Sequence, residues 1–348
     1  MTGIRSLTRH ADAAAPEPAG PEPARHWAGG RAPVVVALVL LVVLAVGSLF
    51  IGVSDVSPIH VLTGAAEQRR IFFVSRVPRL AAIVLSGMAM SVAGLIMQHL
   101  ARNRFVAPST AGTVQSASLG MLVATVWFGQ SSVLAKMLIA TAFALAGTVL
   151  FLQILRHITF ADVMLVPLVG LLFGGVISSI TTFFAYRYDL LQSVDAWTNG
   201  DFSGVLQGRY ELLYVAAGVT VLGYLYADRF TVAGMGRTFA VNLGLRYERV
   251  LNIGLATVAL ITAVVVVTVG SVPFLGLIVP NIVTTILGDN LRRVLPVTAL
   301  FGAGFVLVCD IVSRTIRYPY EIPVGTVGGV VGAVIFLTLI LRERRVAA

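Results

Sequence analysis

The feature that most constrains this chain is a series of ten apolar stretches, most of them long enough to cross a lipid bilayer. A transmembrane helix needs about 20 mainly apolar residues, because the hydrocarbon core is about 30 Å thick. Only 12% of the residues are charged, whereas soluble domains carry about 25%. We therefore predict an all-α polytopic membrane protein with about ten transmembrane helices, over residues 34–53, 80–100, 108–128, 133–155, 163–186, 211–227, 250–270, 272–287, 294–313 and 322–341.

The eighth of these stretches, 272–287, is shorter than a standard span and contains Pro273 and Pro280. Proline removes a backbone hydrogen bond from a helix interior. Irregular backbone is tolerated at membrane depth only where protein covers it or where it lines a cavity. The sequence therefore predicts a broken or tilted helix at this position.

The two ends of the chain are predicted to lie in the cytoplasm. Residues 1–32 are rich in Ala, Pro and Glu without apolar periodicity, which predicts a disordered cytoplasmic tail before a transmembrane domain over 33–345. With this orientation, the inner segments hold 16 of the 25 basic residues but only 8 of the 16 acidic ones. Basic residues are enriched on cytoplasmic loops, and an even number of spans returns the chain to the starting side.

A polar island interrupts the apolar pattern between the sixth and seventh spans, from Asp228 to Arg249. The same orientation places it in the cytoplasm. Glycines at 234, 236 and 244 flank a short, weakly amphipathic segment. One interpretation is a small helix–turn–helix lying on the membrane surface, and the other is an ordinary solvated loop.

Several kinds of chemistry are missing from the sequence. It has no GxxxxGK[ST] phosphate loop, no HExxH or GxSxG motif, and only one cysteine, Cys309. Its five histidines are scattered, so we predict no catalytic residue and no metal site. Ionisable residues are scarce inside the spans, which argues against a carrier driven by ion titration. Energy supplied by a partner protein fits this pattern better.

Arginines gather on the predicted outer side, where Arg69, Arg70, Arg76 and Arg79 precede the second span. They either anchor the chain at the membrane interface or form a cationic patch for an acidic partner. Further along, Asp310 and Arg314 are spaced i,i+4, which predicts a local ion pair. Glu321 and Pro323 suit the start of the last helix and are predicted to be structural.

Five ordered motifs carry a resemblance to one family. They are Arg76–Leu80 (RVPRL), Asn103–Pro108 (NRFVAP), Leu243–Leu245 (LGL), Gly270–Pro280 (GSVPFLGLIVP) and Asp310–Gly325 (DIVSRTIRYPYEIPVG). Together, over about 76–341, they resemble the FecCD-type permeases of ABC importers for iron–siderophores, haem and cobalamin. Many members have P-H-x-x-R in the eighth span, whereas this chain has Pro280 followed by Asn281. That variant resembles the iron–siderophore branch.

The resemblance implies roles for particular residues. ATPase coupling by short helices within the 228–249 island, with Gly236 and Gly244 as hinges, is implied for Phe230, Gly234, Met235, Gly236, Arg237, Leu243, Gly244 and Leu245. Docking of a substrate-binding protein is implied for Arg76, Arg79 and Arg314. A cytoplasmic gate is implied for Asn103, Phe105, Thr159 and Phe160.

The same resemblance implies the partners. Two permease subunits, identical or different, would enclose the pathway in a bacterial cytoplasmic membrane. ABC ATPase subunits would hold ATP and magnesium, so this chain would need no cofactor and would not be an enzyme. A binding lipoprotein or periplasmic protein would deliver the iron–siderophore, and no nucleic acid is involved. The alternatives are a haem or cobalamin permease, a self-powered secondary transporter, and a sensor or assembly scaffold.

Overall fold

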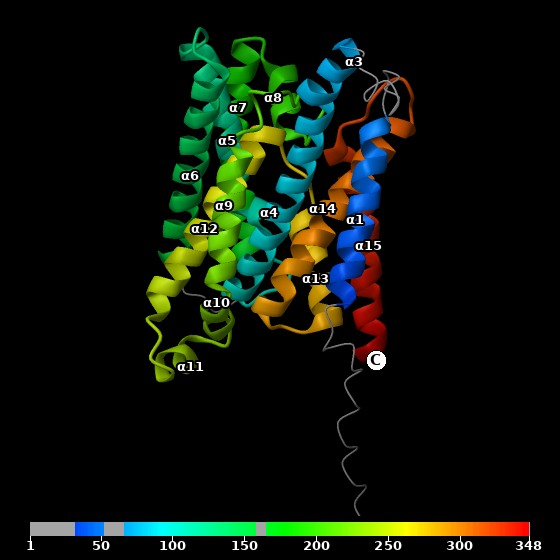
Figure 1. The fold of residues 1–348 in the computed structure, drawn as a ribbon. Coiled ribbons are helices and arrows are strands. Elements are labelled where there is room, and N and C mark those ends of the chain that lie inside the picture. Colours follow the sequence, from blue (N-terminus) through cyan, green and yellow to red (C-terminus); the bar gives the residue numbers. More distant parts are fainter. Residues whose placement is uncertain (1–31, 52–65, 158–164, 348) are drawn as a thin grey trace, which may run out of the picture.

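A computed structural model describes residues 32–51, 66–157 and 165–347 of the chain (Figure 1). These residues form helices and connecting turns, and within them the β-structure is limited to one isolated bridge between Asn199 and Ser271. The predicted tail over 1–32 lies almost entirely outside the described residues. The fold is therefore all-α, as the sequence predicts.

Ten helices of the described residues correspond one by one to the ten predicted spans. They are α1 (Ala32–Phe50), α4 (Val77–Ala101), α5 (Thr113–Trp127), α6 (Val133–His157), α7 (Leu165–Arg187), α9 (Leu213–Leu225), α12 (Tyr247–Val269), α13 (Leu275–Leu287), α14 (Leu291–Thr315) and α15 (Val324–Ala347). Within the described ranges, five helical stretches are long and apolar enough to cross a bilayer by themselves. The prediction of about ten spans is confirmed.

The start of the second span differs from the prediction. Helical backbone runs from α3 (Ala66–Ile71) through a π-helical stretch, η1 (Phe72–Arg76), directly into α4. The residues that precede the predicted second span are thus helical from Ala66 onward. Arg76 and Arg79 consequently lie on an extension of the second span and not in a loop.

Helix α4 is the centre of the bundle, because it packs against α9, α12, α13 and α14. Small residues allow the backbones to approach closely at two of these contacts. A Cβ atom added at Gly87 would lie 2.7 Å from the carbonyl oxygen of Gly302 in α14. One added at Gly94 would lie 2.0 Å from the carbonyl oxygen of Gly276 in α13. At both positions only glycine fits, because a side chain would collide with the backbone of the neighbouring helix.

The eighth span is short, as predicted. Helix α13 covers 13 residues and contains Pro280. The segment before it is irregular, with positive φ at Gly270 and at Phe274. The buried residues of α13 include Pro280 and most of its first half, so surrounding helices cover the interrupted backbone.

The two ends of the bundle carry different short elements (Figure 1). We call one the outer end, where α3 and α8 (Leu191–Thr198) lie. The other is the inner end, where α10 (Ala227–Gly234) and α11 (Arg237–Asn242) lie. The beginning of α1 and the C-terminus both lie at the inner end. A further single turn, η2 (Pro108–Ala111), precedes α5.

The close contact between α4 and α14 makes a testable prediction. Changing Gly302 to alanine would place a Cβ 2.4 Å from the carbonyl oxygen of Gly87. Overpacking of this kind costs about 1–3 kcal/mol, so the unfolding temperature in detergent should fall. Gly304→Ala is the matched control, since that position in the same helix has no atom within 4 Å of an added Cβ. Equal unfolding temperatures for the two variants would contradict the contact.

Candidate functional site

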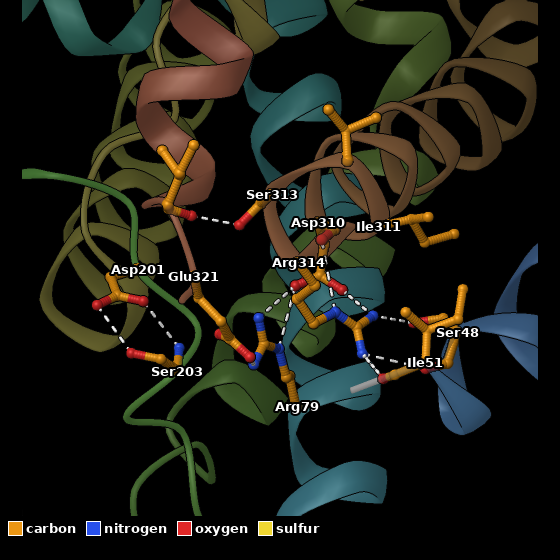
Figure 2. A network of polar contacts seen from close by, with 12 residues as sticks. Ser48, Ile51, Arg79, Asp201, Ser203, Asp310, Ile311, Ser313, Arg314 and Glu321 are labelled. Carbon is orange, nitrogen blue, oxygen red and sulfur yellow. Dashed lines mark hydrogen bonds and ion pairs between the residues drawn. The ribbon is translucent and has the colours of Figure 1, made fainter. Parts of the chain in front are cut away.

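The outer end contains a network of charged side chains around Asp310, which is fully buried in α14. Arg79 of α4 donates from Nε and Nη2 to Asp310 Oδ1, at 3.0 and 2.7 Å. Arg314, one turn after Asp310, donates from Nη2 to Oδ2. Both carboxylate oxygens are therefore paired with guanidinium groups (Figure 2). The predicted i,i+4 ion pair is confirmed.

Glu321 supplies the second carboxylate of the network, from the segment between α14 and α15 (Figure 2). Arg79 Nη1 donates to its Oε1 and Oε2, at 3.1 and 2.8 Å. The segment is held in place by Ser313, whose hydroxyl donates to the carbonyl oxygen of Ile322 and whose carbonyl oxygen accepts from Ile322 N. The network thus joins α4, α14 and the start of α15.

The end of α1 is attached to the same network by its backbone carbonyl groups. Arg76 Nη1 donates to the carbonyl oxygens of Leu49 and Ile51, at 3.0 and 2.8 Å. Arg314 Nη1 donates to those of Ser48 and Ile51, and its Nη2 donates to Ser48 Oγ. Carbonyl groups at a helix C-terminus have no partner in the helix and attract cations. The two arginines therefore cap α1.

Charge in the outer network is unequal. Three guanidinium groups, those of Arg76, Arg79 and Arg314, face two carboxylates, those of Asp310 and Glu321. This count covers the described residues; Arg76 and Arg314 also lie beside the carbonyl groups at the end of α1. Removing one partner of a buried ion pair is destabilising, because the other charge is left buried without compensation.

At the inner end, α10 is fixed firmly to the bundle. The ring of Phe230 is fully buried and lies 6.1 Å from the ring of Tyr226. Asp228 Oδ2 pairs with Arg292 Nη1 of α14 at 2.5 Å. The first amide of α14, Leu291 N, donates to Thr231 Oγ1 at 3.3 Å. These contacts connect α10 to the start of α14.

Helix α11 extends from this anchor with its apolar side chains exposed. Only Ala240 of α11 is buried. Gly236, with φ of 114°, separates α11 from α10, and Gly244, with φ of 78°, separates it from α12. We call the exposed side chains the apolar tip, and each is about half exposed or more: Met235, Phe239, Val241 and Leu243.

The loop after α4 lies beside this helical pair. Asn103 Oδ1 accepts from Phe105 N at 2.9 Å, and Asn103 N donates to the carbonyl oxygen of Gln98. Phe105 is half exposed and meets the ring of Phe336 edge-on. Asn281 of α13 donates to the carbonyl oxygen of Arg104 at 2.9 Å, and so fixes the loop to the short helix.

A groove connects this loop to the helical pair. It has a volume of about 550 Å³ and lies between the end of α4, α10 and the α13–α14 turn. Its lining includes Asn103 on one side and Gly234 and Met235 on the other. His99, at the end of α4, also lines it and places Nε2 3.1 Å from the carbonyl oxygen of Asp289. The structure thus brings Asn103, predicted for the gate, close to Gly234 and Met235, predicted for coupling.

Comparison with known proteins identifies the family. The model of the FecCD transport family matches residues 36–342, which is most of the chain. This chain belongs to the FecCD transport family. The petrobactin import system permease protein YclN of Bacillus subtilis is 53% identical over 309 residues, covering 89% of this chain and 98% of that protein. FatD of Bacillus anthracis, named as a petrobactin import permease, is 40% identical over 90% of this chain and 92% of its own length.

Two further relatives extend the comparison. FatD of Vibrio anguillarum, named as a ferric-anguibactin permease, is 41% identical over 86% of this chain and 95% of its own length. A solved structure described as a metal-chelate type ABC transporter in an inward-facing conformation has a TM-score of 0.76 and 23% identity. It covers 89% of this chain and 98% of its own. The helical arrangement of this chain therefore matches that of the solved structure. As a member of the FecCD family with several apolar helices of membrane-spanning length, the chain is a multi-pass membrane protein.

The residues predicted to couple this FecCD chain to an ATPase fall into two groups. Met235, Arg237 and Leu243 are exposed at the inner end, whereas Phe230 is buried and Leu245 packs against the core. Phe230 thus anchors α10 and does not face outward. The predicted coupling residues did not include Phe239 and Val241 of the apolar tip.

The residues predicted for docking and for the gate are placed by the structure as follows. The structure gathers Arg76, Arg79 and Arg314 into one network, but it places Arg76 and Arg314 inside the protein. Their contact with a binding protein stays a prediction. Of the predicted gate residues, Asn103 lines the groove and Phe105 contacts the ring of Phe336. Thr159 and Phe160 lie outside the described residues.

The buried network predicts that neutralising Asp310 lowers the stability of the protein far more than neutralising the exposed Asp289. Asp310→Asn removes the charge between Arg79 and Arg314, and loss of a buried partner costs about 3–5 kcal/mol. Asp289→Asn is the control, since Asp289 forms an exposed pair with Arg104 at 3.5 Å and such pairs contribute about 0–1 kcal/mol. Thermal unfolding in detergent should show a large loss only for Asp310→Asn. A similar loss for both would contradict the structural importance of the network.

Proposed function

We propose that this chain is the membrane-spanning subunit of an ATP-driven importer for a ferric siderophore of the petrobactin type. In this proposal it lies in a bacterial cytoplasmic membrane and pairs with a second permease subunit. ATP and magnesium belong to two ATPase subunits, so the chain holds no cofactor and performs no hydrolysis. The observation that carries the proposal is the apolar tip on α11, next to a firmly anchored α10.

The apolar tip supports docking to an ATPase. Exposed apolar side chains that are clustered on an otherwise polar segment mark a protein interaction site. The segment lies at the inner end, which the distribution of basic residues places in the cytoplasm. Because α10 is fixed to α4, α12 and α14, a force applied at α11 reaches the helices of the bundle. A flexible loop with the same sequence would dissipate that force.

The relatives support the choice of substrate. Two of them are named as petrobactin import permeases and one as a ferric-anguibactin permease. A more distant relative, FhuB of Bacillus subtilis, is named for iron(3+)-hydroxamate import and is 31% identical. These names favour an iron chelate over haem or cobalamin, which are the alternative substrates within the same family.

The outer network supports the docking of a substrate-binding protein. The arginines gathered there suit an acidic partner, because complementary charges steer and orient association. Arg79 is the arginine of the network that is bonded to the partly exposed Glu321, at the edge of the bundle. In this proposal Arg79 makes the direct contact, while Arg76 and Arg314 hold α1 in position behind it.

The apolar tip can be tested by replacing its central residues. The double variant Met235→Ser and Phe239→Ser removes two of the four exposed apolar side chains without altering buried ones. We expect recovery of the co-expressed ATPase with the tagged permease to fall at least tenfold, since interface anchors of this kind contribute about 2 kcal/mol each. Phe128→Ser is the control, because Phe128 is equally exposed after α5 at the outer end. Normal recovery with the double variant would contradict the coupling function.

A further inference from the structure

The guanidinium group of Arg79 is shared between two carboxylates of different character. Its Nε and Nη2 bind Asp310, which is fully buried and bound by Arg314 as well. Both of its hydrogen bonds to Glu321 come from Nη1. The side chain of Glu321 is 26% exposed, whereas that of Asp310 is 0% exposed. The face of Arg79 toward Glu321 is therefore the one that reaches the protein surface.

The two carboxylates differ in how easily they can be exchanged. Asp310 cannot leave, because its departure would leave Arg314 buried without its carboxylate partner and Arg79 with Glu321 alone. Glu321 has Arg79 as its one recorded ion-pair partner within the described ranges, and water can reach it. If Glu321 turned outward into solvent, Arg79 would still keep Asp310. Only the Nη1 position would then be open to another acceptor.

We propose that Glu321 occupies the place that an acidic side chain of the substrate-binding protein takes when it docks. The incoming carboxylate replaces Glu321 at Arg79 Nη1, and Glu321 is released into solvent. This inference rests on the docking surface proposed above and adds a competitor to it. The competitor resides in the permease itself, so it acts before and after every docking event.

The exchange has a consequence for affinity. Arg79 exchanges one carboxylate for another, so the Coulomb energy gained with the partner is largely offset by the energy lost with Glu321. A partner held in this way is bound weakly enough to leave after delivery. Removing the charge of Glu321 should therefore strengthen docking, in contrast to the loss expected when a contact residue is removed.

A change of the α14–α15 segment accompanies the exchange. Ile322 follows Glu321 directly and is bound to Ser313 at both its backbone groups. Helix α15 begins two residues later, at Val324. Release of Glu321 therefore removes the ion pair between this segment and α4 while leaving the hydrogen bonds to Ser313 of α14 in place.

The test is a double-mutant cycle on the intact permease–ATPase complex in lipid nanodiscs. The probe is the importer's own binding protein loaded with ferric petrobactin, and the readout is its dissociation constant. The four proteins are the parent, Glu321→Gln, Arg79→Gln and the double variant. We expect Glu321→Gln to bind about fivefold more tightly, since partly exposed ion pairs contribute up to about 1 kcal/mol. The double variant should show no gain over Arg79→Gln.

Two controls separate competition by Glu321 for Arg79 from a general effect of removing negative charge at the outer end. Asp195→Asn removes one negative charge from the exposed surface of α8 at the outer end and should leave the dissociation constant nearly unchanged. Glu321→Asp, which shortens the side chain but keeps its charge, should strengthen docking less than Glu321→Gln. It also serves as the substitute should the Gln variant fail to fold.

The outcomes distinguish this inference from the proposed docking surface. If Arg79→Gln weakens binding but Glu321→Gln brings no gain, the competitor role is wrong and the docking surface stands. An equal gain from Glu321→Gln with and without Arg79 would also overturn the competitor role. If Arg79→Gln leaves the affinity unchanged, the docking surface itself is wrong, and this inference fails with it.

Discussion

The close approach of α4 and α14 is the constraint on which the rest of the structure depends. Gly87 and Gly302 let the two backbones touch, and this contact places functional side chains of both helices at each end of the bundle. At the outer end, Arg79 of α4 meets Asp310 of α14. At the inner end, α10 lies against both helices and is bonded to α14 through Thr231 and Leu291. The two candidate functional regions are thus opposite ends of one tightly packed helix pair.

This arrangement explains how a chain without a nucleotide site can take part in ATP-driven transport. In the proposed importer, the ATPase acts on the exposed apolar tip and the binding protein acts on Arg79. The packed pair between them transmits displacement, because close-packed interiors are stiff and deform little. The irregular segment before α13 and the loop at Asn103 lie beside this pair.

Much of the fold could be predicted from the sequence, because each span is a local apolar pattern. The short eighth helix and the Asp310–Arg314 pair also followed from local spacing. The bond from Arg79 to Asp310 could not be predicted, since it joins residues 231 positions apart. Nor could the burial of Phe230 and the exposure of Phe239. In a short segment between a membrane and a partner protein, apolar side chains are suited to either side, and only the packing of α10 against α4 decides.

The most direct test of the central claim is uptake by the purified permease in liposomes. Radioactive iron bound to petrobactin is supplied outside with the loaded binding protein, and the ATPase with ATP and magnesium is enclosed inside. We expect iron to accumulate only when both the ATPase and ATP are present, and we expect no uptake of haem or cobalamin. Uptake driven by a proton or sodium gradient without the ATPase would contradict it.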